Sequence, residues 1–405
     1  MSPSADLVAA CLARVDAVAE EIGEVRRHIH AHPELSWHEE ETTGLLSKRL
    51  GEAGVQVRHL PRNGLVADIG PGAPVVALRA DIDALPVPDL TTDPWSSTVE
   101  GVAHACGHDV HAAALLGVGL ALQALHDQGR LPGAVRLVFQ PAEEIMPGGA
   151  LMCLEEGVLD GVGRIFGLHC DPSLDVGQIG VRQGPLTGAA DSLSVTLTGK
   201  GGHTSRPHLT EDLTFALGKL VTELPAVLSR RLDPRAGVSV VWGMVRAGSA
   251  MNVIPAVGQL AGTVRMLDAV AWADAEALVR DTIVQIVEPY GVRAAVTYVR
   301  GVPPVVNEHQ STQLLSRAVE DVLGDPGLVP TTQSLGGEDF AWYLEKASGA
   351  MGRLGTRTPG GPTYDLHQGD LRVDERAVAI GAKVLAATAL RALVAGRTAG
   401  QITGR

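Results

Sequence analysis

The sequence predicts an α/β protein built on a mostly parallel sheet with helices on both faces, interrupted by a smaller inserted domain. Short, nearly continuous apolar runs, typical of strands buried on both faces, alternate with segments of helical apolar spacing. The middle of the chain instead alternates apolar and polar residues, as in strands with one solvated face. At 405 residues the chain exceeds one ordinary domain, so we expect two.

The first domain is predicted to consist of helices that alternate with buried strands. Helical spacing covers residues near 7–27 and 39–53, and three buried strands are predicted at 75–81, 135–140 and 164–169. Polar side chains follow each strand at its carboxyl end, where open α/β sheets build their sites. The α/β pattern returns after residues 303–304, so the first domain is expected to be discontinuous, comprising residues 1–184 and 301–405.

The inserted domain is expected at residues 185–300. Its predicted order is strand, helix, two strands, helix and strand, the ferredoxin-like βαββαβ pattern of an α+β domain. These elements are expected near residues 193–197, 211–228, 238–245, 259–266, 273–287 and 294–299. We expect this domain to act as a lid.

Composition excludes several classes of function. The formal charge of −13 argues against nucleic acid as a partner. Every run of about 20 apolar residues has polar breaks, and the first residues lack the order of a secretory signal, so no membrane span is expected. The four cysteines form no CxxC pair, which predicts free thiols and a cytoplasmic location.

Cys106 and His108 are the first candidate metal ligands. A thiolate and an imidazole two residues apart precede a long apolar run, 110–125, that predicts a helix. The helix N-terminus favours a thiolate at Cys106. The alternative is a buried structural cysteine beside Asp109, a residue suited to capping the helix.

The next two strands supply further candidates. Glu143 and Glu144 follow a buried strand, where adjacent carboxylates need a positive charge between them; the alternative is a solvated acidic loop. His169 ends the third strand, and Cys170 is expected to point to the opposite face. A lone histidine such as His169 is often a structural residue.

Together with His367 from a late loop, these residues offer one thiolate, three imidazoles and one carboxylate, more than a single four-coordinate ion needs. They suit two ions bridged by Cys106, with Glu143 as general base. Asp81 is a candidate for orienting a histidine ligand, and the alternative is a strand-end turn residue.

Two residues of the inserted domain are candidates for contact with substrate. His203 follows the glycine-rich turn 199–202 and is suited to donate to a developing oxyanion. Asn252 is suited to bind a substrate carboxylate or carbonyl. Ordinary turn chemistry is the alternative for both. No clustered carboxylate or cysteine completes a metal shell around the histidines at 28, 30 and 32, so we expect a structural or surface role for them.

Nine stretches resemble those of the amidohydrolase branch of the aminoacylase and carboxypeptidase metallopeptidase family. This branch includes hippurate hydrolases, N-acyl-amino-acid amidohydrolases, N-acetyldiaminopimelate deacetylases and auxin-conjugate hydrolases. The stretches follow one order across nearly the whole chain: residues 32–36, 78–86, 104–109, 140–144, 167–169, 199–203, 252–255, 337–340 and 366–367.

The resemblance implies a dinuclear metal centre and a homodimer or higher oligomer formed through the inserted domain. The implied ligands are Cys106, His108, Glu144, His169 and His367, with Glu143 as base. The implied ions are zinc, manganese, cobalt or nickel. His203 and Asn252 are then residues that reach the site of the partner subunit. An aromatic residue common after the last ligand is absent from residues 368–371, which puts the local packing there in doubt.

The expected activity is hydrolysis of the amide bond of a small N-acyl amino acid to a carboxylic acid and a free amino acid. A dipeptidase or carboxypeptidase on the same scaffold is the near alternative. A non-catalytic ligand-binding homologue is the distant one, and it predicts loss of Glu143 or of a ligand, whereas all are present.

Overall fold

The computed structural model of the protein describes residues 5–402, with side chains described for residues 5–395. The chain divides into two compact units. Unit 1 comprises Met1–Gly184, Val306–Thr332 and Trp342–Arg405, and unit 2 comprises Pro185–Val305 and Gln333–Ala341. Unit 2 therefore includes residues 301–305 and Gln333–Ala341, which were expected in the first domain.

Unit 1 holds one eight-stranded sheet with the order β1-β2-β4-β3-β5-β16-β6-β15. Its strands are β1 (Val57–His59), β2 (Leu65–Ile69), β3 (Pro74–Asp81), β4 (Ala134–Gln140), β5 (Arg164–Asp175), β6 (Ile179–Val181), β15 (Leu328–Pro330) and β16 (Ser348–Arg357). The central strands β4, β3, β5 and β16 are parallel, whereas β2 is antiparallel to β1 and β4, and β6 to β16. The mostly parallel α/β sheet predicted from the sequence is confirmed.

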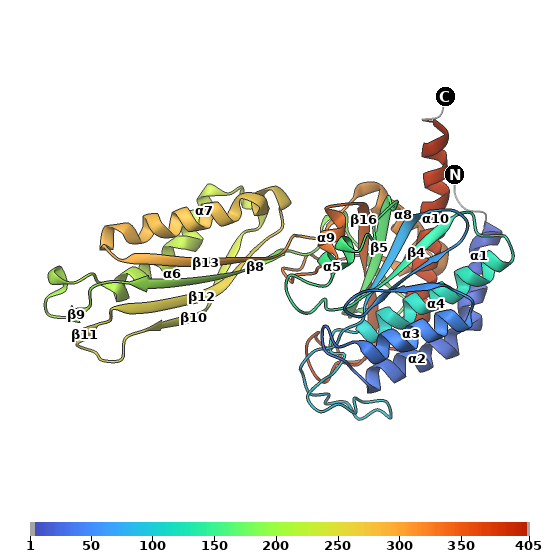
Figure 1. Cartoon of the computed structure of the whole chain (residues 1–405), viewed down its shortest axis with the longest axis horizontal. Coiled ribbons are helices and arrows are strands. Elements are labelled where there is room, and N and C mark those ends of the chain that lie inside the picture. Colours follow the sequence, from blue (N-terminus) through green and yellow to red (C-terminus); the bar gives the residue numbers. More distant parts are fainter. Residues whose placement is uncertain (1–4, 403–405) are drawn as a thin grey trace. The chain divides into compact units, whose positions relative to one another are not determined.

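The helices of unit 1 begin and end as follows. They are α1 (Ala5–Ala17), α2 (Ala19–Ala31), α3 (Glu40–Glu52), α4 (His108–Asp127), α5 (Ala150–Glu155), α8 (His309–Leu323), η4 (Asp325–Gly327), α9 (Ala341–Leu344, from the unit boundary) and α10 (Arg376–Ile402). Short strands β7 (Gly184–Pro185) and β14 (Val306–Asn307) lie where the chain passes between units. Figure 1 shows α2, α3 and α4 together on one side of the sheet.

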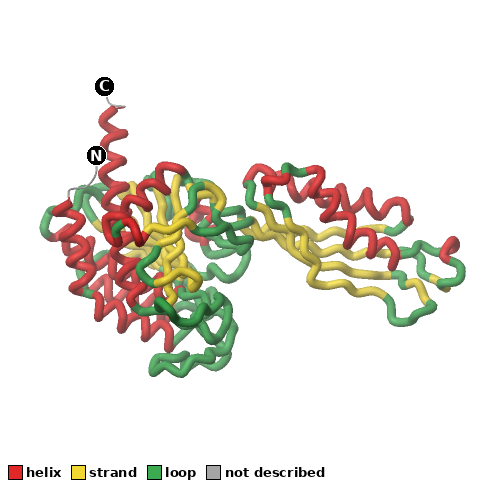
Figure 2. Tube along the Cα trace, turned by 180° about the vertical axis from the view of Figure 1, so that it is seen from behind, coloured by secondary structure: helices red, strands yellow, loops and turns green. Residues whose placement is uncertain are grey.

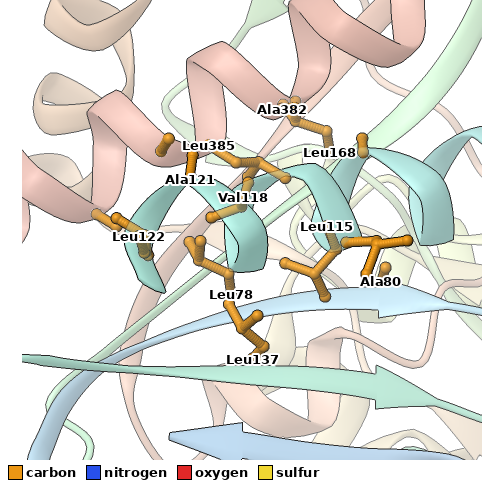
Figure 3. Packing of buried hydrophobic residues seen from close by; sticks show 14 of the residues in the cluster. Leu78, Ala80, Leu115, Val118, Ala121, Leu122, Leu137, Leu168, Ala382 and Leu385 are labelled. Carbon is orange, nitrogen blue, oxygen red and sulfur yellow. The ribbon is translucent and has the colours of Figure 1, made fainter. Parts of the chain in front are cut away.

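The core of unit 1 lies between the sheet and α4, α8 and α10. Figure 3 shows Val118 of α4 between Leu78 of β3 and Leu385 of α10, all fully or nearly fully buried. Arg79 alternates with Leu78 and points to the other face of the sheet. There Tyr343 of α9 donates from its hydroxyl to Oε1 of Gln140 at 3.0 Å, so helices contact both faces.

β5 is longer than expected. The predicted strand ended at His169, but β5 continues to Asp175 because its second half pairs with β16, from Arg353 opposite His169 to Arg357 opposite Asp175. An ion pair of 2.7 Å between Arg357 Nε and Asp175 Oδ1 fixes the far end. His169 therefore lies within a strand and is held by backbone pairing on the β16 side.

Unit 2 holds a four-stranded antiparallel sheet with the order β10-β12-β8-β13, and α6 and α7 pack on one face of it, as Figure 2 shows. Its elements are β8 (Ala189–Thr198), β9 (Gly202–His203), η1 (Pro207–Leu209), α6 (Leu213–Arg231), η2 (Pro234–Ala236), β10 (Ser239–Ala247), β11 (Val253–Ile254), β12 (Val257–Met266), α7 (Ala269–Val287), η3 (Glu288–Tyr290) and β13 (Arg293–Val302). The order of its main elements is the predicted βαββαβ.

Two helices of unit 1 have the length and apolar composition of membrane spans. They are α4 and the stretch Arg376–Ala395 of α10, whose most apolar windows are 83% and 72% buried within the fold. Both pack in the core described above, which accounts for their apolar composition without a membrane.

Candidate metal centre

A tight turn brings Cys106 and His108 to the carboxyl edge of the sheet. Gly107 has φ +84°, and a Cβ at that position would lie 2.8 Å from Sγ of Cys170. Only glycine fits this turn without displacing its neighbour. The helix α4 begins at His108 with no side-chain cap. Asp109 instead forms an ion pair with Arg26, whose Nε lies 2.7 Å from Oδ2 of Asp109, so the expected capping role is wrong.

The ring of His108 is held by its far nitrogen. Nδ1 lies 2.9 Å from the backbone carbonyl oxygen of Asp83, which can only accept, so Nδ1 donates. In the neutral ring, Nε2 then presents its lone pair. This Nε2 is buried and has no hydrogen-bond partner among the described residues.

His169 is oriented in the same way. Its Nδ1 donates to the carbonyl oxygen of Cys170 at 2.8 Å, and its Nε2 lies 3.4 Å from Sγ of Cys106. Metal-binding histidines characteristically donate their second ring N–H to a carbonyl or carboxylate. Both His108 and His169 have this arrangement.

Glu144 and His367 lie near the same thiol. Oε1 of Glu144 is 3.5 Å from Nε2 of His367 and 3.8 Å from Nε2 of His108. Within the described part of the chain this buried oxygen accepts no hydrogen bond. His367 has φ +63°, an uncommon conformation for a residue other than glycine, and its backbone N–H donates to the carbonyl of Ala105 at 2.7 Å.

Cys106 is common to two sets of donor atoms. In one set it joins His108 and His169, in the other Glu144 and His367, and within each set the donor atoms lie within 4.8 Å of one another. Two buried ligand atoms without a hydrogen-bond partner among the described residues, Nε2 of His108 and Oε1 of Glu144, lie beside the shared thiol of Cys106. This arrangement fits a pair of divalent cations. The structure thus brings together all five residues that the sequence singled out as candidate ligands.

The charges of this cluster favour a cation. Burial raises the pKa of the Cys106 thiol well above its usual range, and burial also raises the pKa of Glu144. Burial lowers the pKa of His108, but the charges of Asp81 and Cys106 outweigh burial and raise this pKa well above its usual value, so a positive charge is favoured beside these two groups. Burial, with the charge of Arg353, holds the pKa of His169 well below its usual value. A metal ion held by these residues would supply positive charge and stabilise the thiolate.

Glu143 lies beside the cluster on a constrained turn. After β4 ends, Ala142 adopts φ +55°, and its N–H donates to Oε1 of Glu39 at 2.8 Å. The Glu143 side chain is buried, and one of its oxygens lies within 4.8 Å of donor atoms of His108 and Glu144. Strained backbone that is held by such contacts is common at functional sites.

Asp81 contacts two histidines of this region. Asp81 Oδ1 lies 2.5 Å from Nδ1 of His111, which is not among the five, while Oδ2 is 3.6 Å from Nε2 of His108. His111 is satisfied, because its Nε2 accepts the N–H of Cys170 at 2.8 Å. Asp83 was expected only as a polar residue at the carboxyl end of the first buried strand, with no role assigned to it.

Asp83 contacts three parts of the site. Besides holding His108 through its carbonyl, it accepts the backbone N–H of Glu144 at 3.0 Å and the Ser36 hydroxyl at 2.6 Å. The only signal for it was a second carboxylate two residues after Asp81, on the same side of an extended segment.

His203 and Asn252 lie together in unit 2. β9 and β11 pair antiparallel with His203 opposite Val253, and the N–H of Thr204 donates to the carbonyl of Asn252 at 3.2 Å. Both side chains are exposed. Nδ1 of His203 accepts the N–H of Ser205 at 3.1 Å, so in the neutral ring the proton resides on Nε2 and can be donated outward.

Comparison with known proteins identifies the family and close relatives. The family described as Peptidase family M20/M25/M40 matches residues 77–391. An N-acetylcysteine deacetylase of Bacillus subtilis is 38% identical over 90% of this chain and 95% of the relative. The solved YXEP protein of B. subtilis, described as a dinuclear metal-binding peptidase from the M20 family, has a TM-score of 0.81 at 35% identity over 94% of this chain and 99% of that chain.

A further relative is much longer than this chain. It is a provisionally named glutamate–cysteine ligase of Rhodococcus jostii, 48% identical over 90% of this chain. The chain spans only 46% of that relative's length.

Proposed function

The chain belongs to peptidase family M20/M25/M40 and is a metal-dependent hydrolase of amide bonds; from this premise we propose that it cleaves N-acyl amino acids to a carboxylic acid and a free amino acid. The observation that carries the proposal is the pair of donor sets sharing Cys106, with Glu143 beside them.

The proposed metal ligands are the five residues of the two donor sets. Cys106, His108 and His169 would hold one ion, and Cys106, Glu144 and His367 would hold the other. Thiolate and imidazole suit zinc, cobalt or nickel, and the carboxylate also admits manganese. When bound, two such ions lower the pKa of a water molecule and polarise a carbonyl oxygen.

Glu143 is the proposed general base. It takes the proton from the attacking water as the water oxygen forms its bond to the acyl carbon. As the C–N bond breaks, Glu143 returns that proton to the leaving nitrogen, which departs as the amine of the free amino acid. Asp83 positions this step, because it holds both His108 and the backbone of Glu144.

His203 and Asn252 are proposed to bind the substrate. The Nε2–H of His203 donates to the oxyanion that forms on the acyl oxygen. This role is supported by the hydrogen bond that Nδ1 accepts from Ser205, because it leaves the proton of the neutral ring on Nε2. Asn252 binds the carboxylate or carbonyl of the substrate. We further propose a homodimer formed through unit 2 and a cytoplasmic location, where the four free, buried cysteines stay reduced.

A release assay tests the substrate class. Metal-stripped protein would be incubated with a panel of N-acyl amino acids, including N-acetylcysteine, and with dipeptides, each with zinc, manganese, cobalt or nickel added back. Release of carboxylic acid from the acyl compounds is expected. Cleavage of dipeptides alone would establish the dipeptidase alternative, and no cleavage of any compound would favour the ligand-binding alternative.

A Glu143→Ala variant tests the mechanism. Because Glu143 moves the proton without being a proposed ligand, kcat is expected to fall about 10²–10⁴-fold while bound metal is retained. Metal content by mass spectrometry and kcat are the two measurements. Glu155→Ala, a change at an exposed carboxylate of the same unit, is the matched control. Full activity in Glu143→Ala would show that another group is the base.

A further inference from the structure

A second cluster of metal-ligating side chains lies at the junction of α2 and α3. His28 lies in the last turn of α2, His32 follows as its C-terminal cap, and Glu41 lies in the first turn of α3. One donor atom from each residue lies within 4.8 Å of the others. The carboxylate that the sequence around residues 28–32 lacked is therefore supplied by the next helix.

The two imidazoles are arranged as a pair. Their ring centroids are 4.4 Å apart at an interplanar angle of 31°, as expected for residues one helical turn apart. Nδ1 of His32 lies 2.9 Å from the carbonyl oxygen of His28, so it carries a proton and donates. In the neutral ring this leaves Nε2 of His32 with its lone pair, the tautomer that metal-binding histidines adopt.

The third donor is at metal-binding distance from the first. Nε2 of His28 and Oε1 of Glu41 are 3.3 Å apart. Two ligand atoms bonded at about 2.0 Å to a tetrahedral zinc ion are about 3.3 Å apart. The side chains are 44% and 57% exposed, so an ion can enter from solvent and water can complete the coordination.

We propose that His28, His32 and Glu41 form a third, peripheral site for a divalent transition ion of the zinc class. Two imidazoles and one carboxylate favour zinc, nickel or copper over magnesium or calcium. The ion would join the end of α2 to the start of α3 and so fix the connecting segment. That segment includes Glu34, which accepts the N–H groups of Glu41 and Thr42 at 2.8 Å each.

The peripheral site shares no residue with the catalytic cluster. His30, between the two histidines in sequence, points inward, and its Nδ1 is 2.8 Å from Oδ2 of Asp109. Removing the peripheral ion is therefore expected to leave hydrolysis unchanged. The proposal does not depend on the assigned reaction.

Zinc uptake measured by equilibrium dialysis tests the site, with zinc alone as the probe on metal-stripped full-length protein. His32→Gln and Glu41→Gln should each bind one zinc per chain fewer than the wild type at the same free zinc, with unchanged kcat. His38→Gln, a change at an exposed histidine of the same segment, is the matched control and should bind as the wild type does. The quantity compared is the difference in zinc bound per chain between variant and wild type. This difference is the same whether or not two further ions occupy the catalytic cluster.

Thermal unfolding gives a second measurement. Added zinc should raise the Tm of the wild type more than that of His28→Gln or His32→Gln, because an ion bound only by the folded state stabilises it. Equal zinc uptake and equal Tm increments in wild type and variants would overturn the proposal. Equal Tm values without metal would show that the substitutions leave the fold intact.

Discussion

Cys106 is the residue on which both proposed metal positions depend. Its thiol is buried, it lies 3.4 Å from His169, and it is the only donor common to both sets of described residues. Replacement by Ala removes one ligand from each position. Loss of a residue that only hydrogen-bonds to a metal ligand lowers metal affinity about 10–100-fold. Because Cys106 is itself a proposed ligand, its loss is expected to lower zinc affinity by more than this.

A Cys106→Asp variant distinguishes the ability of residue 106 to bridge two ions from its character as a soft thiolate ligand. An aspartate can still bridge two ions, but its oxygens are harder ligands than a thiolate. We expect it to bind more metal than Cys106→Ala and to shift the preference from zinc toward manganese. Metal content and activity with each ion are the measurements. An Asp variant that behaves like the Ala variant would argue against a bridging role.

Glu39 gives a pH dependence of stability. Burial, reinforced by the charge of Asp83, raises the pKa of its carboxyl from the ordinary 4.5 to about 7. The folded state then binds the proton more tightly than the unfolded state. Stability from this group is greatest below the ordinary pKa and is lost as pH rises toward 7, by up to about 3 kcal/mol.

Glu39→Gln tests that dependence. The Gln carbonyl can still accept the N–H of Ala142, while the ionisation is gone. In urea unfolding of metal-free protein, the variant should gain stability relative to wild type between pH 5.5 and pH 8. A constant difference across this range would contradict the assignment.

At the residue scale, the candidate metal ligands can be picked out from the sequence more readily than the groups that orient them. The structure brings Cys106, His108 and Glu144 together at the carboxyl edge of the sheet, where the order of strands and polar residues in the sequence led us to expect a site. The contact of Asp83 with His108 was not predictable because it is made by a backbone carbonyl, which every residue type possesses. Glu41 was missed because its partners lie on another helix.

At the element scale, α2 and α4 are joined by a buried charged network behind the metal-binding turn. Oδ2 of Asp109 lies 2.7 Å from Nε of Arg26 in an ion pair and accepts a hydrogen bond from Nδ1 of His30 at 2.8 Å. Burial raises the pKa of Asp109, but the charges of Arg26 and His30 outweigh burial and hold it well below its usual range. Its contribution to stability is therefore present above its ordinary pKa and is lost as pH falls below it.

Asp109→Asn should destabilise the protein by about 3 kcal/mol, because it leaves the charge of buried Arg26 largely uncompensated. The free energy of unfolding in urea at neutral pH is the measurement. Asp127→Asn, at the exposed end of the same helix, is the control and should change stability little. Similar effects from both substitutions would show that the network does not join α2 to α4.

The elements themselves were predictable where their apolar pattern continues. The buried runs of β3 and β4 and the apolar helix α4 were recognised from the sequence. The second half of β5 was not, since its residues are mostly polar or half-exposed and only pairing with β16 makes them a strand. Long-range pairing of this kind leaves no local pattern in the sequence.

At the scale of the whole molecule, the inserted unit was predictable from the return of the α/β pattern, but its full extent was not. Gln333–Ala341 has no strand or helix period of its own. It belongs to unit 2 because Ser334 N–H donates to the Leu186 carbonyl at 3.0 Å and Gln333 Nε2 to the Pro185 carbonyl at 3.2 Å. Such contacts appear only after the chain has folded.

The proposed homodimer has a suitable surface on unit 2. β10 is an edge strand of the sheet, paired only with β12 among the described residues, and Val241 and Val245 on it are 61% and 56% exposed. An unpaired strand edge with exposed apolar side chains is a natural place for a second copy to add its own strand. If the dimer also shares His203 between subunits, each catalytic centre requires both chains.

Mixing two inactive variants tests this sharing. Glu143→Ala keeps His203, and His203→Ala keeps Glu143, so a mixed dimer with shared sites contains one complete site of two. Random reassociation gives mixed dimers in half of the population, and activity should recover to about a quarter of wild type. Glu143→Ala mixed with Glu143→Gln is the control and should stay inactive. Mixed dimers isolated by two affinity tags but without activity would show that His203 serves its own chain.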